Sequence, residues 1–298
     1  MDSPDCTYKT KHNHNQYPIS NSYHFVTDKS NHMKRLAQKS MLALSLFFIA
    51  AISNSLKAQK EKQKKDYYLI KVYHCKSTDQ VNMVNDYLEK AYLPALHQHG
   101  FEKIGVFTRY DNDTATDKRV YVFIPNTVVQ KLLLLDDELL KDGNLQKNGT
   151  TYLQAAYNTP PYQRIETIVL RAFKDHPTFA LPQLTGPLTE RIYELRSYEG
   201  SNETFYHQKV KMFNEGGEIN IFKSLNFNAV FYAEVLSGCH MPDLMYMTTF
   251  NNISDRDAHW KAFGDSPAWK TLSALPEYQH TVSTANIYLL HPTSFSDF

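Results

Sequence analysis

Beyond its first sixty residues, the chain alternates short β-type runs with stretches of helical periodicity. The first run, YYLIKVYH at 67–74, is rich in β-branched and aromatic residues and predicts a strand. A helix is predicted after the N-cap candidates Ser77 and Thr78, with apolar residues every three or four positions up to Gly100. Pro94 is expected to kink or shorten this helix.

The same order of elements then occurs twice. In the first half, further strands are predicted at 103–110, 119–124 and 164–171, with a helix at 128–140. In the second half, the predicted elements are strands at 191–198, 229–235, 244–250 and 286–290, a long helix at 202–225, and helices that start near Asp255 and Ser266. Each half therefore reads as a β-α-β-β-α-β unit.

This pattern predicts an α+β protein built from two tandem ferredoxin-like units, at 66–173 and 189–293. The segment between them, 174–188, contains three prolines and excludes a helix or a central strand, so it is predicted to be a linker. A ferredoxin-like unit has helices on only one face of its sheet. We therefore expect the two sheets to pack against each other as a pseudo-dimeric α+β barrel.

The N-terminal region has the pattern of an export signal. A basic stretch precedes an apolar run at 41–52, which is shorter than the roughly 20 residues that a membrane-spanning helix needs. Residues 33–58 are predicted to be a signal peptide cleaved after Ala58, and a short membrane anchor is the alternative. Residues 1–32 are polar and without periodicity, so we expect them to be a disordered over-extension, with Met33 as the true start.

Charge and cysteine content narrow the class of protein further. The chain has 32 Lys+Arg and 31 Asp+Glu, and removal of residues 1–58 takes away seven basic and three acidic residues, leaving 25 and 28. Such a chain lacks the basic excess that a nucleic-acid binder needs, so no nucleic acid partner is expected. The mature protein should be exported, periplasmic or extracellular, without a stable membrane span. Cys75 and Cys239 could pair there, although two free, half-buried thiols fit the pattern better.

Specific residues from about 190 to the C-terminus carry a family resemblance. They are Tyr193–Tyr198, Phe213–Glu218 and Met241–Met247, followed by Arg256, Trp260, Phe263, Asp265, Pro267 and Trp269. On these residues the second half resembles the NIPSNAP family, a branch of the dimeric α+β barrel superfamily. The resemblance implies the fold, and it implies a small-molecule binding, structural or interaction role. The wider superfamily adds an alternative, a cofactor-free monooxygenase. The first half matches only in the order of its elements.

The helix predicted at 202–225 carries an apolar stripe and, beside it, a polar one. The apolar stripe is Tyr206, Val210, Phe213, Gly217 and Ile221, and the polar stripe is His207, Lys211, Asn214 and Glu218. Gly217 in the apolar stripe indicates either close backbone approach or an empty volume over the sheet. A solvated edge with a Lys211–Glu215 ion pair is the plainer interpretation of the polar stripe. A Glu215–Glu218 pair that supplies an acid or a base is the other.

These features place a candidate ligand pocket between the helices and the sheet of the second half. Its predicted residues are His207, Asn214, Gly217, Glu218, Tyr246, Arg256, His259 and Trp260. Polar groups in an apolar cleft are the usual composition of a small-molecule site, and ordinary core packing is the alternative. We assign no catalytic residue, metal or cofactor, and enzymatic activity is the less favoured interpretation. The monooxygenase alternative would use His207 or His259 as its base. A small-molecule ligand and a homo-oligomeric partner both stay open.

The first testable prediction concerns processing. We expect cleavage after Ala58, or within one or two residues of it, because the basic and apolar regions lead into the Leu-Lys-Ala run. N-terminal sequencing of the exported protein should read from about Gln59. An exported chain that starts at Met1 would contradict both the signal peptide and the assignment of Met33 as the start.

Overall fold

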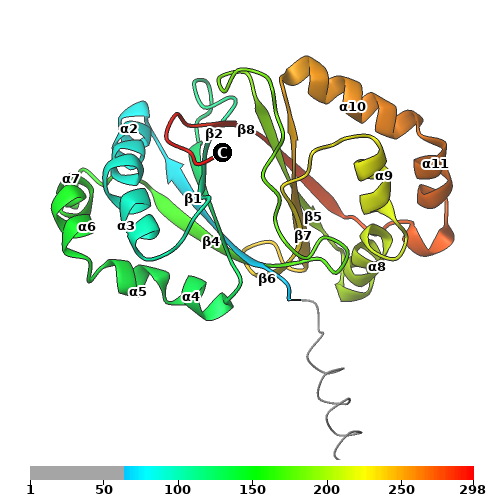
Figure 1. The fold of residues 1–298 in the computed structure, drawn as a ribbon, viewed down its shortest axis with the longest axis horizontal. Helices are drawn as coiled ribbons and strands as arrows, with labels where there is room; N and C mark the ends of the chain where they lie inside the picture. The colour runs from blue at the N-terminus through cyan, green and yellow to red at the C-terminus, as the bar shows by residue number, and fades with distance from the viewer. Residues whose placement is uncertain (1–63) are drawn as a thin grey trace, which may run out of the picture. The chain divides into compact units, whose positions relative to one another are not determined.

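Eight strands rich in aromatic and β-branched residues form the centre of the fold (Figure 1). In the computed structural model, which describes residues 64–298, they are β1 (Tyr67–Cys75), β2 (Gly105–Arg109), β3 (Lys118–Asn126), β4 (Arg164–Ala172), β5 (Ile192–Glu199), β6 (Phe231–Ser237), β7 (Asp243–Phe250) and β8 (Thr284–Pro292). They close into one antiparallel barrel in the order β1-β3-β2-β8-β5-β7-β6-β4. The predicted N-terminal over-extension and signal peptide lie outside the described residues.

The two halves of the chain contribute four neighbouring strands each. The first half supplies β4-β1-β3-β2 and the second β8-β5-β7-β6, which is the same order within each half. The expectation of two stacked sheets needs correction here, because the outer strands of the two halves pair with each other. Phe107 of β2 lies opposite Pro292 of β8, and Leu170 of β4 lies opposite Val235 of β6. Closure leaves none of the eight strands with a free edge.

Helices cover the outside of the barrel, those of the first half on one side and those of the second half on the other (Figure 1). The first set is α2 (Thr78–Tyr87), a π-helical turn η1 (Leu88–Tyr92), α3 (Leu93–Gln98), α4 (Val129–Leu133), α5 (Leu135–Leu139), α6 (Gly143–Asn148) and α7 (Thr150–Leu153). The second set is α8 (Glu203–Phe213), α9 (Glu218–Ser224), α10 (Ile253–Asp265), α11 (Pro267–Ser273) and the 3-10 turn η2 (Pro276–Tyr278).

Two helices of the first half differ from their predictions. Pro94 does not end its helix, because the π-helical turn η1 precedes it and Pro94 lies at the start of α3, where a missing N–H is tolerated. The helix predicted at 128–140 is instead divided into α4 and α5 around Leu134. Consecutive leucines at 132–135 cannot all face the core of one straight helix, and Leu133 and Leu134 remain exposed.

The period of two along each strand separates an inner core from two outer cores. On β1, Tyr68, Ile70 and Val72 face the barrel interior, whereas Leu69 and Tyr73 face the helices. The interior is filled by large side chains, among them Phe107, Tyr121, Phe123, Tyr193, Phe231, Met245 and Met247. Because these side chains pack the interior, the space for a ligand lies outside the barrel, in the layers between sheet and helices.

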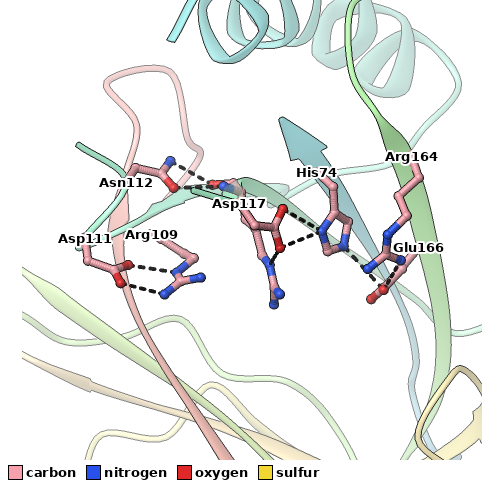
Figure 2. Close-up of polar contacts among 8 residues, drawn as sticks. His74, Arg109, Asp111, Asn112, Asp117, Arg164 and Glu166 are labelled. Atoms are coloured by element: carbon pink, nitrogen blue, oxygen red, sulfur yellow. Dashed lines mark hydrogen bonds and ion pairs between the residues drawn. The ribbon is translucent and has the colours of Figure 1, made fainter. Parts of the chain in front are cut away.

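A chain of ion pairs ties β1, β3 and β4 together at one end of the first half (Figure 2). His74 Nδ1 lies 2.9 Å from Asp117, and His74 Nε2 lies 3.3 Å from Glu166. Asp117 also accepts a hydrogen bond from Arg119, and Glu166 pairs with Arg164. Both ring nitrogens of His74 therefore lie near carboxylates. Burial opposes ionisation of Asp117, but hydrogen bonds from Arg119 and His74 hold the pKa of this carboxyl below its usual value.

The two cysteines of the described region are both free. Cys75 is buried at the end of β1, and burial raises the pKa of its thiol to about 11. Cys239 follows β6 and is exposed. In this structure neither thiol is half-buried as predicted, since Cys75 is buried and Cys239 is exposed.

Asp243 is a buried carboxyl on the inner face of β7, where Ser197 of β5 donates a hydrogen bond of 2.8 Å to its Oδ2 atom. Its Oδ1 atom is buried without a partner among the described residues. Burial raises the pKa of Asp243 to about 7. The folded protein therefore keeps this proton at pH values where the unfolded chain, with an aspartate pKa of about 4, has released it.

The second prediction follows from the raised pKa of Asp243 in the folded protein. The stability that protonated Asp243 contributes is present at low pH and is lost as the pH rises towards 7, because only the folded state binds the proton in that range. Asp243→Asn cannot ionise, so we expect its free energy of unfolding to exceed that of the wild type by about 1 kcal/mol or more at pH 8, and by less at pH 5. Urea unfolding at both pH values measures this difference. For the exposed control Asp113→Asn, the difference in unfolding free energy from the wild type should be the same at both pH values. If the difference for Asp243→Asn is also the same at both pH values, the proton does not belong to Asp243.

Candidate functional site

One face of β5 brings polar side chains into a layer that is apolar in most sheets. Glu194, Arg196 and Tyr198 alternate with Tyr193 and Leu195, so the three polar residues face the helices while the other two face the barrel interior. Each of the three then requires a partner, because a buried polar group without one costs about 1–3 kcal/mol.

Glu194 is fully buried, with an exposed fraction of 0%, and it receives hydrogen bonds from three residues. Arg196 binds its Oε1 atom, whereas Arg256 Nε and Trp260 Nε1 of α10 donate to Oε2 at 2.7 and 2.8 Å. The Arg196 guanidinium also lies 3.5 Å from the centre of the Trp260 ring. The carboxylate thereby holds two cations and an indole in place beside the sheet.

From Arg196, hydrogen bonds continue along the sheet to two tyrosines. Arg196 Nη1 donates to the Tyr198 hydroxyl at 2.8 Å, and this hydroxyl lies 2.9 Å from that of Tyr246. Tyr246 is on β7, directly opposite Arg196 in the strand register. Burial raises the pKa of Tyr246 well above its usual value, so this hydroxyl keeps its proton at neutral pH.

A second buried ion pair faces this chain from the helices. Lys209 of α8 donates to Glu218 Oε2 of α9 at 2.7 Å, and the two residues are 5% and 2% exposed. The Lys209 ammonium also lies 4.8 Å from the centre of the Phe213 ring. Burial raises the pKa of Glu218, although Lys209 and Arg196 partly offset this effect.

A cavity of about 410 Å³ lies between these two groups of residues. It is lined by Arg196, Tyr198, Lys209, Met212, Glu218, Phe222, Tyr246, Trp260, Phe263, Trp269, Ser273, Tyr278, Gln279, His280, Thr281, Val282 and Ala285. This size and this mixture of aromatic walls with a few charged groups are typical of a small-molecule site. We call it the sheet–helix cavity.

Three of the eight predicted pocket residues line this cavity, namely Glu218, Tyr246 and Trp260. Arg256 lies one layer behind, in contact with Glu194. These four residues therefore lie at or next to a cavity between the helices and the sheet of the second half, which is the layer predicted for the pocket.

The other four predicted residues do not line it. His207 is exposed on α8, and Asn214 accepts a hydrogen bond from the backbone N–H of Asp175 at 3.1 Å. Gly217 lies just before α9, and His259 faces a different cavity. The two imidazoles that the monooxygenase alternative would use as bases are thus outside the sheet–helix cavity.

A break in the predicted helix explains this separation. The chain leaves α8 at Phe213 and enters α9 at Glu218, with Gly217 in the left-handed conformation at a φ of +84°. Gly216 provides the close approach, because a Cβ atom there would lie 2.6 Å from the Met212 carbonyl oxygen. The expectation that Gly217 opens volume in one continuous helix is therefore wrong. Gly217 is needed instead for the left-handed turn between α8 and α9.

The break also changes the polar stripe. Glu218 turns into the buried layer and meets Lys209, whereas His207 stays in solvent. Lys211 pairs with Glu277 at 2.9 Å, and not with Glu215 as predicted. The stripe is not one solvated helix edge, because the two helices that share it point their side chains in different directions.

The predicted pocket residues do not include four residues at this site, namely Glu194, Arg196, Tyr198 and Lys209. The first three had a readable signal, since three polar residues at alternate positions of one strand must share a face. The signal for Lys209 was its spacing from Met212 and Phe213, which places it on the buried side of α8.

A larger cavity of about 690 Å³ lies under the linker. The linker residues 175–184 form one side of it, and α9 and the start of α10 form others. His259 faces this cavity, and its Nδ1 atom lies 3.2 Å from Asp255. Asn251 holds the linker by accepting hydrogen bonds from the N–H groups of Thr185 and Gly186. Phe222 lies between the two cavities and lines both.

The fold and this site define an α+β barrel protein with a charged, aromatic cavity in one half. Residues 193–297, within the second half of the chain, match the NIPSNAP family model. The match begins in β5 and ends after β8, and it includes every residue of the sheet–helix cavity.

Several solved structures are similar to the chain. A proposed monooxygenase from Fusobacterium nucleatum has 9% identity and a TM-score of 0.49, covering 77% of this chain and 93% of that one. Another from Lactobacillus acidophilus has 12% identity and a TM-score of 0.47, covering 76% and 94%. A NIPSNAP family protein of unknown function from Agrobacterium tumefaciens has 21% identity and a TM-score of 0.32, covering 37% and 96%.

No curated protein sequence matches the chain significantly. Within residues 64–298, no helix combines the length and the hydrophobicity that crossing a bilayer requires. In the same range, no three His, Cys, Asp or Glu side chains gather in a way that could hold a metal ion.

The third prediction tests the role of Gly217. Gly217→Ala should destabilise the protein by about 1 kcal/mol, because an L-residue resists a φ of +84°. Gly264→Ala is the matched control in α10, where a Cβ atom meets nothing within 4 Å, and it should be neutral or stabilising by up to about 1 kcal/mol. Urea unfolding of both variants measures the difference. Equal stabilities would mean that the turn does not depend on glycine.

Proposed function

We propose that the second half of this chain binds a small organic acid with a planar apolar body in the sheet–helix cavity. The observation that carries the proposal is the balance of charge in the cavity lining. Two cations, Arg196 and Lys209, line the cavity together with one carboxylate, Glu218. An anionic ligand would neutralise the excess positive charge.

Burial strengthens this preference. Coulomb interactions in a poorly solvated cavity are several-fold stronger than in water, so a lining with more cations than carboxylates favours an anionic ligand. Arg196 is the best placed cation, because its guanidinium is held by Glu194 and stacked on Trp260. Phe222, Phe263 and Trp269 supply apolar surface for the body of the ligand.

The monooxygenase alternative is less well supported by the geometry. It was predicted to use His207 or His259 as a base, and neither imidazole faces the sheet–helix cavity. Ligand binding requires only the charges and walls already described, and it is therefore the function we propose.

We also propose that residues 66–173 and 189–293 are tandem ferredoxin-like units joined by the linker 174–188. The equal strand order of the two halves supports this. A further support is the pattern Tyr-x-x-(Lys/Arg)-x-Tyr, which occurs once in β1 and once in β5. Export by the segment at 33–58 remains a proposal of the same kind.

The repeat suggests why we place the ligand in the second half alone. Lys71 of β1 stands where β5 has Arg196, and it pairs with Asp136 of α5 at 2.7 Å. The Lys71 ammonium lies 5.2 Å from the centre of the Tyr92 ring. Tyr87, which neighbours Tyr92, stacks on Tyr152 with ring centres 3.9 Å apart. Tyrosine rings thus occupy the layer that in the second half holds the cavity.

The fourth prediction tests binding. At concentrations of about 100 times the dissociation constant, a ligand stabilises the folded state by about 2.7 kcal/mol, so phenylacetate should raise the melting temperature of the mature protein. Benzyl alcohol, which is similar in shape but uncharged, should raise it much less. Ser273→Phe fills the cavity and should abolish the shift.

Thr271→Phe is the matched control for this variant, since Thr271 is exposed on the same helix α11. It should retain the full shift. Equal shifts in Ser273→Phe and Thr271→Phe would place binding outside the sheet–helix cavity. An absence of any shift with a panel of aromatic acids would refute the proposed function.

A further inference from the structure

We propose that the sheet–helix cavity catalyses keto–enol proton transfer on the organic acid that it binds, with Glu218 as the base and the Tyr246 hydroxyl as the donor to the developing oxyanion. The inference rests on the proposed function, because the acid must first bind. The substrate class is a 2-oxo acid with an aromatic body.

Glu218 has the position of a base. It lines the cavity, and its Oε2 atom is held by Lys209 at 2.7 Å. Its Oε1 atom accepts no hydrogen bond from any of the described residues, so this oxygen is free to take a proton from a ligand. Burial raises the pKa of this carboxyl, and a carboxylate of raised pKa is a stronger base.

Tyr246 has the position of an oxyanion donor. The Tyr198 oxygen accepts a hydrogen bond from Arg196, so its own proton can go to the Tyr246 oxygen at 2.9 Å. The Tyr246 proton is then left to be donated into the cavity. Hydrogen bonds in such a chain polarise one another, and the cation at its start makes the last hydroxyl a stronger donor.

The two groups lie on different sides of the same space. Tyr246 comes from the sheet, and Glu218 comes from the helices that cover it. A planar ligand between them would present its carbonyl oxygen to one and the adjacent carbon to the other. Lys209 or the outer side of Arg196 would meet its carboxylate.

The reaction needs no further reagent. The Glu218 carboxylate removes a proton from the carbon next to the carbonyl, the C–H electron pair forms a C=C bond, and the carbonyl π pair moves to oxygen as an enolate. The Tyr246 hydroxyl stabilises this negative charge. Water protonates the enolate oxygen to give the enol, and the proton on Glu218 passes to the hydroxide that this leaves, so atoms and electrons balance.

Phenylpyruvate is the probe for the experiment. Keto–enol conversion is followed by ultraviolet absorbance, and exchange of the C3 protons in D₂O is followed by NMR. The wild type should accelerate both above the buffer rate. Glu218→Gln should lower the enzymatic rate at least 100-fold, and Tyr246→Phe about 10-fold. Glu215→Gln, an exposed neighbour, should keep the wild-type rate.

Glu218→Gln also removes the charge partner of Lys209, so Glu218→Asp is measured in parallel. Glu218→Asp keeps the negative charge but moves the carboxylate away from the substrate. We expect this variant to be folded, as measured by near-ultraviolet circular dichroism, and to have a rate at least 10-fold lower than the wild type. A wild-type rate in folded Glu218→Asp or Glu218→Gln would overturn the assignment of the base.

If phenylpyruvate raises the melting temperature of the wild type without accelerating exchange, the catalytic inference fails and the binding proposal stands. If it gives neither a shift nor exchange while other aromatic acids bind, the substrate class is wrong.

Discussion

Strands β1, β3, β5 and β7 are buried on both faces along most of their length, and this constraint determines the rest of the structure. One face packs into the barrel interior and the other lies under helices, so side chains in the middle of these strands have little access to water. A polar residue on such a strand needs a buried partner. Glu194, at an exposed fraction of 0%, meets this requirement with two arginines and a tryptophan. The charged cluster is thus a consequence of strand geometry combined with three polar residues in β5.

The two halves meet the same requirement in different ways. In the first half, Lys71 pairs with Asp136 and the surrounding layer is filled by stacked tyrosines. In the second half, Arg196 is drawn sideways to Glu194 and Trp260, and the space in front of it stays open. The asymmetry comes from side chains, since the strand order is the same in both halves.

The turn between α8 and α9 is the second feature on which the cavity depends. A continuous helix would carry Glu218 around its axis, away from Lys209. The left-handed Gly217 redirects the chain, so that Glu218 enters the buried layer nine residues after Lys209. The stability of this turn and the charge balance of the cavity are therefore coupled through one residue. A local backbone requirement thereby sets the electrostatics of the proposed site.

The sequence by itself determined the strands, their repeated order, the linker and the α+β class, because hydrophobic periodicity is local and each element spans only a few residues. It also predicted, from Gly217 and the polar residues near it, that any ligand pocket would lie between the helices and the sheet of the second half. Tertiary structure alone decided the closure of the barrel, which pairs Arg109 with Leu290 across most of the chain. It also decided which charges meet. Arg256 reaches Glu194 only because α10 packs across β5, and no spacing along the chain encodes that contact. Partners far apart in sequence are chosen by packing, and packing depends on the whole fold at once.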